Sequence, residues 1–106
     1  MSGQELRNEL SKGLDPQVDA MPPDLVRRHF REIISKYKVE AYGWRKNHDD
    51  LDKVDTYISG ILSSQKEFME WSETWASRPI PNAVVVDRMA EGITKILNSR
   101  NYYRDS

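Results

Sequence analysis

The chain has 106 residues, of which 38% are hydrophobic and 31% charged, and its formal net charge is −1. This length fits one compact domain with a single core, and the composition is not that of a disordered chain. The absence of cysteine excludes disulfides, thiolate zinc sites and cysteine nucleophiles. The nearly balanced charge argues against bulk electrostatic attraction to nucleic acid or to an anionic membrane.

No apolar run approaches the roughly 18 residues that cross a bilayer. The polar segment 1–5 lacks the basic and apolar regions of a signal peptide. We therefore expect a cytoplasmic protein that does not enter a membrane. Because the chain shows neither internal repeats nor low-complexity segments, its elements are predicted one by one.

A short first helix is predicted over residues 2–12. Leucines recur there every four residues, at Leu6, Leu10 and Leu14, and Gly13 stands where a helix would end. Several prolines follow, and a residue before proline is pushed out of the helical region. The segment is therefore expected to be a helical arm followed by a linker.

The second predicted helix covers about residues 23–46. Prolines open it, and Asp24 lies where a carboxylate meets the positive end of the helix dipole. Its apolar face follows alternating steps of four and three residues and is widened by three neighbours. The members of this face are Val26, Phe30, Ile33, Tyr37 and Trp44, with Glu40 as the one polar position and Leu25, Ile34 and Ala41 alongside.

The third predicted helix covers about residues 50–76 and has the clearest pattern. Positions spaced 3.5 residues apart are mostly apolar, which is typical of a long helix packed along its length against another. These positions are Leu51, Val54, Ile58, Ile61, Gln65, Phe68, Ser72 and Trp75.

Two prolines, Pro79 and Pro81, then exclude a helix. A fourth helix is predicted over about residues 83–98, with Asn82 as its N-cap. The valine run at 84–86 would by itself suit a strand, so a strand at the start of this helix stays open. The polar residues 99–106 are expected to fray.

These elements predict an all-α fold, a small bundle. Two long helices, at about 23–46 and 50–76, form an antiparallel hairpin because their connection is short. A shorter N-terminal helix and a C-terminal helix pack against this hairpin. In domain terms, residues 1–21 are an N-terminal helical arm and linker, and residues 22–106 are the bundle core.

The two long segments carry opposite charge. Residues 22–48 hold seven Lys or Arg against three Asp or Glu, a net +4, and residues 49–76 hold two against seven, a net −5. Opposite charge is expected to favour their pairing. Two shorter helices leave part of the hairpin's apolar surface uncovered, so we also expect a homodimer.

The doublet His48-Asp49 resembles the His-Asp doublet of all-helical metal phosphohydrolases, with His29 and Asp87 as further candidate ligands. The resemblance is limited to this dipeptide, and such enzymes use several ligands on a larger bundle. The favoured interpretation is a turn histidine beside an N-capping Asp49.

Carboxylates at three-residue spacing form two clusters on the third predicted helix. Such carboxylates share a helix face and can hold Mg²⁺ over a pyrophosphate. They resemble the Glu-x-x-Glu and Glu-x-x-Asp pairs of helical nucleotide pyrophosphohydrolases, which face each other from neighbouring helices. Here both clusters lie on one helix, roughly 27 Å apart by helical rise, so a solvated acidic face is favoured. The clusters are Asp49, Asp52 and Asp55, and Glu67, Glu70 and Glu73.

A basic stripe follows the second predicted helix opposite its apolar face. Such a stripe can follow a phosphate backbone or meet an acidic protein surface. The net charge of −1 argues against nucleic acid, which leaves an acidic protein partner or a solvated face as the favoured interpretations. The stripe and its neighbours are Arg27, Arg28, Arg31, Lys38, Tyr42, Arg45 and Lys46.

Three aromatic residues, Phe68, Trp71 and Trp75, end the third predicted helix. Aromatics at this spacing belong either to the core or to an interface, where tryptophan is a preferred anchor. Both interpretations stay open. The three residues are therefore included in the predicted partner-binding set.

The sequence lacks a nucleophile elbow and phosphate-binding glycine loops, so we predict no enzyme activity, no catalytic or metal site and no cofactor. The favoured prediction is a protein–protein interaction module that acts as adaptor, inhibitor or assembly factor on another protein. One alternative is a nucleic-acid-associated protein that uses the basic stripe. The other is a Mg²⁺-dependent nucleotide pyrophosphohydrolase.

Overall fold

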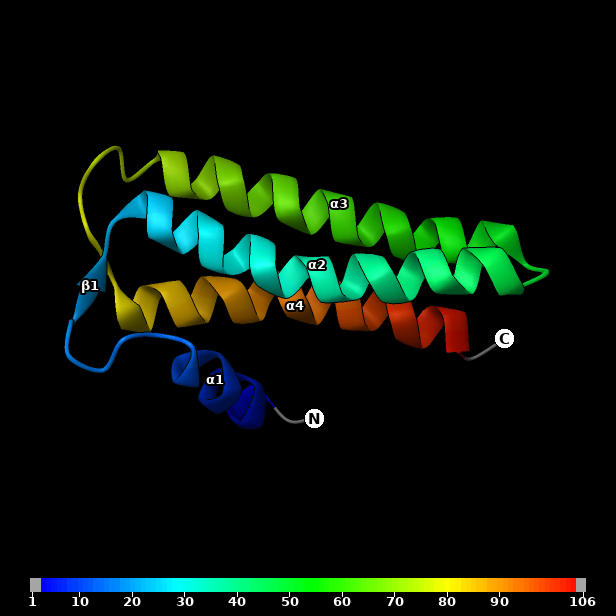
Figure 1. Ribbon diagram of the computed structural model, residues 1–106, viewed down its shortest axis with the longest axis horizontal. Helices are drawn as coiled ribbons and strands as arrows, with labels where there is room; N and C mark the ends of the chain where they lie inside the picture. The colour runs from blue at the N-terminus through cyan, green and yellow to red at the C-terminus, as the bar shows by residue number, and fades with distance from the viewer. Residues whose placement is uncertain (1–2, 105–106) are drawn as a thin grey trace.

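Three long helices and one short helix build the structure (Figure 1). The computed structural model describes the backbone of residues 3–104 and the side chains of residues 3–100. The predicted all-α fold with a helical hairpin is confirmed. In chain order the elements are α1 (Gly3–Lys12), β1 (Ala20–Met21), α2 (Pro23–Asn47), α3 (Leu51–Glu73), β2 (Ile80–Pro81) and α4 (Asn82–Arg104).

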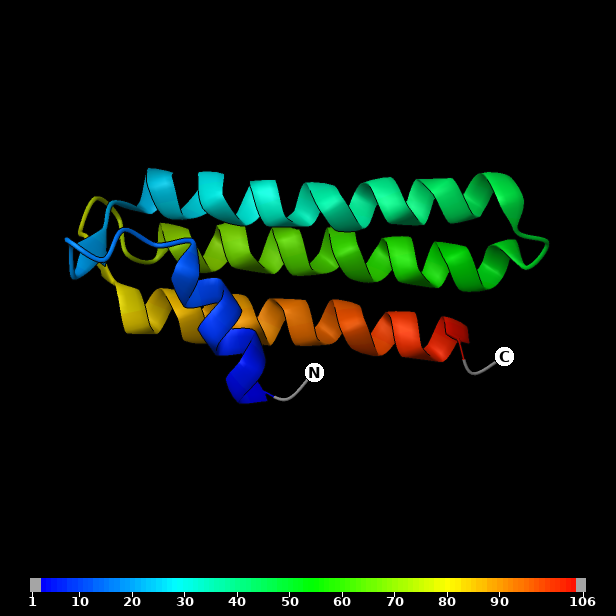
Figure 2. The ribbon, with the colours of Figure 1, turned by 60° about the horizontal axis from the view of Figure 1, so that its bottom comes forward.

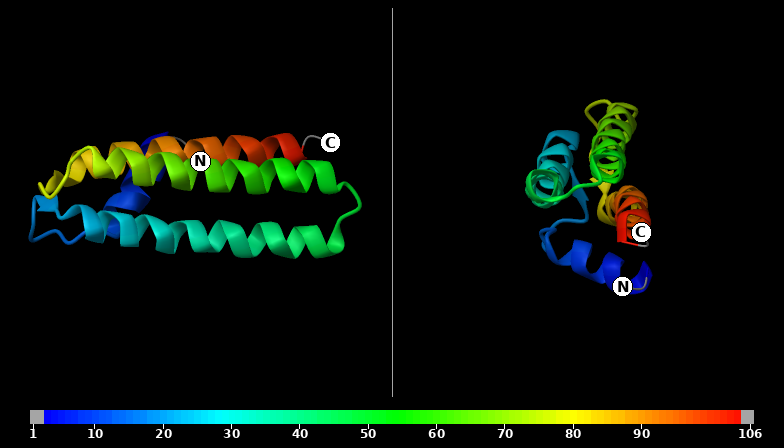
Figure 3. Two further views of the ribbon diagram at one scale, coloured as in Figure 1. Left: turned by 90° about the horizontal axis from the view of Figure 1, so that it is seen from above. Right: turned by 90° about the vertical axis from the view of Figure 1, so that its right-hand side faces the viewer.

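Helix α3 is the central element, because both α2 and α4 pack along it. Helices α2 and α3 form the antiparallel hairpin, and α4 runs parallel to α2 (Figure 1, and Figure 3, left). The short α1 lies obliquely across α4 (Figure 2). In the end-on view α2, α3 and α4 lie at the corners of a triangle (Figure 3, right). The resulting bundle is 46 Å long and 26 by 17 Å across.

The turn between α2 and α3 is held by Asp50. Its Oδ1 accepts a hydrogen bond of 3.2 Å from the backbone N–H of Lys53, which caps α3. Its own backbone N–H donates to Nδ1 of His48 at 3.1 Å. His48 is therefore a turn residue, as predicted, but the N-cap is Asp50 and not Asp49.

The buried face of α3 differs from the predicted heptad positions. Tyr57 and Ser64 are buried, whereas the predicted Ile58 and Gln65 are only partly buried and Leu51 is exposed. A helix packed against one neighbour needs one narrow stripe, but α3 packs against two. Its buried face is therefore wider and is rotated from the predicted stripe.

Helix α4 is longer than predicted. It begins at Asn82, includes the valine run at 84–86 and continues through residues 99–104, which were expected to fray. Residues 105–106 of the same prediction lie outside the described residues. The valine run is helical because Val85 and Val86 are buried in the bundle, so packing overrides their strand preference.

Asn82 does not cap α4 as predicted. Its Nδ2 donates to the carbonyl oxygen of Val18 at 2.8 Å. Its backbone N–H donates to the carbonyl oxygen of Asp19 at 2.9 Å. Beside these bonds, β1 and β2 pair antiparallel, with Met21 opposite Ile80. The linker before α2 is thus tied to the linker before α4. We call this end of the bundle the ladder end, and the end with the α2–α3 turn the hairpin end.

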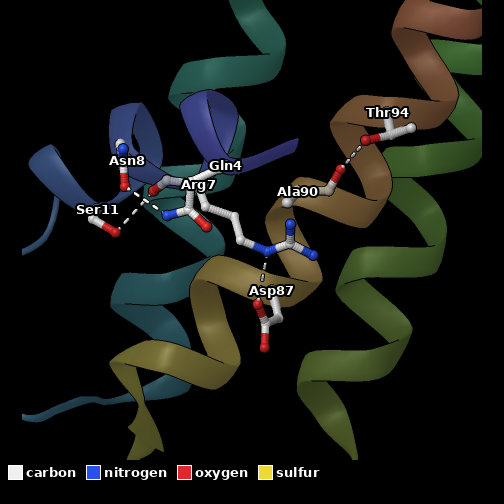
Figure 4. Close-up of polar contacts among 7 residues, drawn as sticks. All are labelled: Gln4, Arg7, Asn8, Ser11, Asp87, Ala90 and Thr94. Atoms are coloured by element: carbon white, nitrogen blue, oxygen red, sulfur yellow. Dashed lines mark hydrogen bonds and ion pairs between the residues drawn. The ribbon is translucent and has the colours of Figure 1, made fainter. Parts of the chain in front are cut away.

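The N-terminal segment shares the hydrophobic core of the bundle. Leu6, Leu10 and Leu14 are buried in the same cluster as the long helices. Outside the core, Nε of Arg7 on α1 pairs with Oδ1 of Asp87 on α4 at 3.1 Å (Figure 4). No helix in residues 3–104 has an apolar stretch long enough to cross a bilayer.

Candidate functional site

The solvent face of α2 carries large apolar side chains between charged ones. Leu25, Val39 and Tyr42 are 47%, 74% and 49% exposed. Leu25 was predicted to join the core, but it points away from it. With their neighbours these residues follow alternating three- and four-residue steps, which places them on one line along the helix. We call this line the α2 ridge: Leu25, Arg28, Glu32, Ser35, Val39, Tyr42 and Lys46.

Positive charge accompanies the α2 ridge. Arg31 and Lys38 lie together on one flank of it, by helical periodicity, and Lys46 ends it. Within the described residues these three cations form no ion pair. Arg28 approaches Glu32 at 3.8 Å on the exposed surface, where such a pair contributes little. The ridge therefore presents cationic groups that remain available to an acidic surface.

Two residues of the predicted set, Arg27 and Arg45, turn toward α3 instead. Nε of Arg27 donates to Oγ of Ser72 at 2.6 Å, and its Nη1 pairs with Asp24 at 2.8 Å. Arg45 pairs with Asp55. Both side chains hold the helical hairpin together and offer a partner little free hydrogen-bonding capacity.

The predicted aromatic set divides between core and surface. Phe68 is fully buried, and its ring stacks on Phe30 with centroids 3.9 Å apart. It is part of the core and offers no surface to a partner, so its place in the partner-binding set is corrected.

Trp71 and Trp75 are partly buried at the ladder end of α3, with ring centroids 6.3 Å apart. An arginine covers each indole: Cζ of Arg88 lies 5.8 Å from the Trp71 ring, and Cζ of Arg78 lies 5.3 Å from the Trp75 ring. Trp71 and Trp75 therefore form a second, smaller surface, separate from the α2 ridge.

Three acidic side chains of α3, Asp55, Glu67 and Glu70, are engaged in ion pairs. Glu67 accepts a hydrogen bond of 2.6 Å from Lys95 on α4, and this bond lowers the pKa of the Glu67 carboxyl. Glu70 lies 3.8 Å from Lys66. Among the described residues, no three His, Asp or Glu side chains converge in a way that could hold a metal ion. Three of the six cluster carboxylates, Asp55, Glu67 and Glu70, thus pair separately with different cations, and the clusters do not form a joint Mg²⁺ site within the described residues.

A groove of about 940 Å³ opens between α1, α2 and α4. The sequence analysis did not find it, because its walls come from three helices that are distant in the chain. The apolar walls include Leu6, Leu10, Ile33, Ile93 and Leu97, and the polar lining includes Glu9, His29, Lys36, Tyr37, Glu40 and Arg100.

Two groove residues, Glu40 and Arg100, belong to a polar and aromatic cluster at the hairpin end. Nη2 of Arg100 pairs with Oε1 of Glu40 at 3.1 Å, and its Cζ lies 5.6 Å from the Trp44 ring. The Trp44 ring is 5.3 Å from that of Tyr57. Burial, followed by the charge of Glu40, raises the pKa of Tyr57 to about 12. Burial also raises the pKa of Tyr37, which lines the groove.

No protein-family model, curated protein or solved structure matches the chain. Two surfaces of the protein have the chemistry of a binding site: the α2 ridge and the groove.

Proposed function

We propose that the protein is a non-enzymatic protein-binding module, an adaptor, inhibitor or assembly factor that engages an acidic partner through the α2 ridge. The observation that carries this proposal is the alignment of Leu25, Val39 and Tyr42, all exposed, on one helix face. Burying apolar area against a partner is favourable by about 25 cal/mol per Å². Tyrosine and arginine are also enriched where proteins meet.

The charge of the ridge selects the class of partner. Arg28, Arg31, Lys38 and Lys46 accompany the apolar side chains. Complementary charge steers association and rejects partners of like charge. An acidic surface with an apolar centre would therefore match the ridge in both respects. The proposal places the contact on one face of one helix, so substitutions there should spare the fold.

Site-specific photo-crosslinking in cells of the source organism tests the proposal. A crosslinkable amino acid replaces Val39 at the centre of the ridge, and a matched control replaces Ser59, which is exposed on α3. We expect a discrete crosslinked protein from position 39 and none from position 59. The double charge reversal Arg31→Glu with Lys38→Glu should abolish the crosslink and leave the helical circular dichroism and the melting temperature unchanged.

Three outcomes would contradict the proposal. One is a crosslink that survives the charge reversal, and another is the absence of a crosslink at position 39. The third is retardation of an oligonucleotide that weakens steeply with salt and is lost in the reversed variant, since this would assign the ridge to nucleic acid. A crosslinked homodimer would instead identify the acidic partner as a second copy of the chain, and light scattering measures that mass directly.

A further inference from the structure

Helix α1 lies on α4 with a hollow on each side of it. Leu6 and Leu10 line the groove of about 940 Å³, and Arg7 and Ser11 line a second hollow of about 340 Å³ on the other side of the helix. Between the two hollows α1 crosses α4 obliquely (Figure 2). Leu6, Leu10 and Leu14 are only 8%, 7% and 7% exposed. Helix α1 is therefore attached along one narrow line of leucines.

Hydrogen bonds within α1 hold the helix but not its place on the bundle. Nε2 of Gln4 donates to Oδ1 of Asn8 at 3.0 Å, and Oγ of Ser11 donates to the carbonyl oxygen of Arg7 at 2.8 Å (Figure 4). The ion pair of Arg7 with Asp87 joins α1 to α4, but its side chains are 46% and 69% exposed. Such surface pairs contribute little to stability. These bonds of α1 would survive if the helix left the bundle.

The chain is anchored to the bundle directly after this segment. The carbonyl oxygens of Val18 and Asp19 accept hydrogen bonds from Asn82, next to the β1–β2 ladder. Before the anchor the linker bonds to itself, since the backbone N–H of Val18 donates to the carbonyl oxygen of Asp15 at 3.3 Å. Residues 3–17 are therefore able to move as a unit while the ladder end stays intact.

A close approach at Gly13 brings this segment against α2. A Cβ at Gly13 would lie 2.5 Å from Cε1 of His29, closer than two such atoms tolerate. By contrast, a Cβ at Gly43 of α2 would meet nothing within 4 Å. An alanine at position 13 should therefore push the segment off the bundle, and an alanine at position 43 should not.

We propose that α1 is a releasable strap over a helix-docking face of α4. Residues 3–17 leave the bundle as one unit, hinged at the β1–β2 ladder, while α2, α3 and α4 stay packed. Release uncovers Val86, Ala90 and Ile93, which share the buried cluster of the α1 leucines and lie on one face of α4.

The chemistry of the occupant follows from the helix that the face already holds. Helix α1 presents leucines at four-residue spacing and, beside them, Arg7 for Asp87. The released face therefore accepts another amphipathic helix with this leucine pattern and a cation next to it. The groove that borders this face shares no residue with the α2 ridge, so the inference does not depend on the proposed acidic partner.

Residue-resolved hydrogen exchange of the full chain, followed by NMR, tests the release. The amides of residues 8–12 should exchange at least about tenfold faster than that of the buried Ile61, through an opening that low urea leaves unchanged. Their protection should be equal, because the strap opens as one unit. Protection that rises steadily along α1, as in fraying, or opening only together with Ile61 would overturn the proposal.

The two glycines supply a matched pair of variants. Gly13→Ala should lower the protection of residues 8–12 about tenfold and leave that of Ile61 unchanged, because the added methyl group overpacks the contact with His29. Gly43→Ala is the control and should leave the protection of residues 8–12 as in the wild type. Equal protection of residues 8–12 in the two variants would overturn the proposal.

Competition by a peptide tests the docking face. An unlabelled peptide of residues 3–17, added to the isotope-labelled full chain, should displace the strap and lower the protection of residues 8–12. Half of the straps should be displaced near the effective concentration of the tethered segment, which is on the order of millimolar for a short linker. The control peptide carries alanine in place of its three leucines and should displace none. Equal effects of the two peptides, or no effect of either, would overturn the proposal.

A second copy of the chain is the rival occupant of this face. Protection of residues 8–12 that rises with protein concentration, together with the mass of a dimer by light scattering, would show that a second copy holds α1 in place and would overturn the proposal. Gly13→Ala should leave crosslinking from position 39 unchanged, so failure of the strap and failure of the α2 ridge are distinguishable.

Discussion

The two ends of the bundle are packed by different chemistry. At the ladder end, Phe30 stacks on Phe68, and Gly92 makes room for them, because a Cβ there would lie 3.3 Å from Cζ of Phe30. At the hairpin end, Tyr57 and Arg100 meet among aromatic rings with hydrogen-bonding capacity left over. The same three helices thus end in an apolar contact on one side and in an amphipathic cluster on the other.

Because of this difference, the two ends of the bundle are expected to contribute unequally to its stability. Close apolar packing contributes most where large side chains are fully buried, as Phe30 and Phe68 are. Unsatisfied buried donors reduce stability. The ladder end is therefore expected to contribute more to the stability of the fold than the hairpin end.

The largest expected effect is at the ladder end. Phe68→Ala removes one ring of the buried stack and should lower the free energy of unfolding by about 3–5 kcal/mol. Trp44→Ala at the hairpin end should lower it less, because Trp44 is only partly buried. Guanidinium denaturation followed by circular dichroism measures both. Leu62→Ala is the control, since Leu62 is 48% exposed and its loss should change stability by no more than about 0.5 kcal/mol. Equal losses for Phe68→Ala and Trp44→Ala would contradict the comparison.

A smaller effect of opposite sign is expected from Tyr57→Phe at the hairpin end. The variant removes a buried hydroxyl that has no partner among the described residues, so it should stabilise the protein by about 1 kcal/mol at neutral pH. The pKa of Tyr57 is raised from 10.0 to about 12 by folding. The free energy of unfolding of the wild type is therefore unaffected by this group below pH 10 and falls as the pH rises to 12. The stability gap between variant and wild type should therefore widen over that range. A gap that stays constant from pH 8 to 12, measured by urea denaturation, would show that Tyr57 is not buried in this way.

The helices of the bundle were predictable because each follows from a local pattern. The 3.5-residue spacing on α3 and the prolines before α2 predicted two helices to within a few residues. The β1–β2 ladder was missed because Met21 and Ile80 are distant in the chain, and two-residue strands leave no periodic signal. The valine run at 84–86 has a local strand preference that burial against the bundle overrides.

The candidate sites also differ in whether a local sequence pattern predicts them. The members of the α2 ridge share one helix. Helical periodicity alone therefore predicted that Arg28 and Tyr42 of the ridge, and Arg31 beside it, lie on the polar side of this helix. Val39 could have been found by the same periodicity, as an apolar residue opposite the core face. The groove could not be found in this way, because its walls come from α1, α2 and α4 and meet only through tertiary packing.

The smallest expected effect tests whether backbone strain destabilises the ladder end. Ala76, just past the end of α3, has a φ of 53°, in the left-handed region that disfavours residues with a Cβ by about 1–2 kcal/mol. Ala76→Gly should therefore raise the free energy of unfolding by roughly 0.5–1 kcal/mol, which a thermal melt would show as a rise of a few degrees. Ala83→Gly, in the exposed first turn of α4, is the control and should lower stability by a similar amount, because glycine is unfavourable in a helix. If both variants lose stability, the turn at Ala76 is not strained. If Ala76→Gly gains stability, backbone strain at the ladder end adds to the cost of buried polar atoms that lack a partner among the described residues at both ends, Oδ1 of Asn82 at the ladder end and the Tyr57 hydroxyl at the hairpin end.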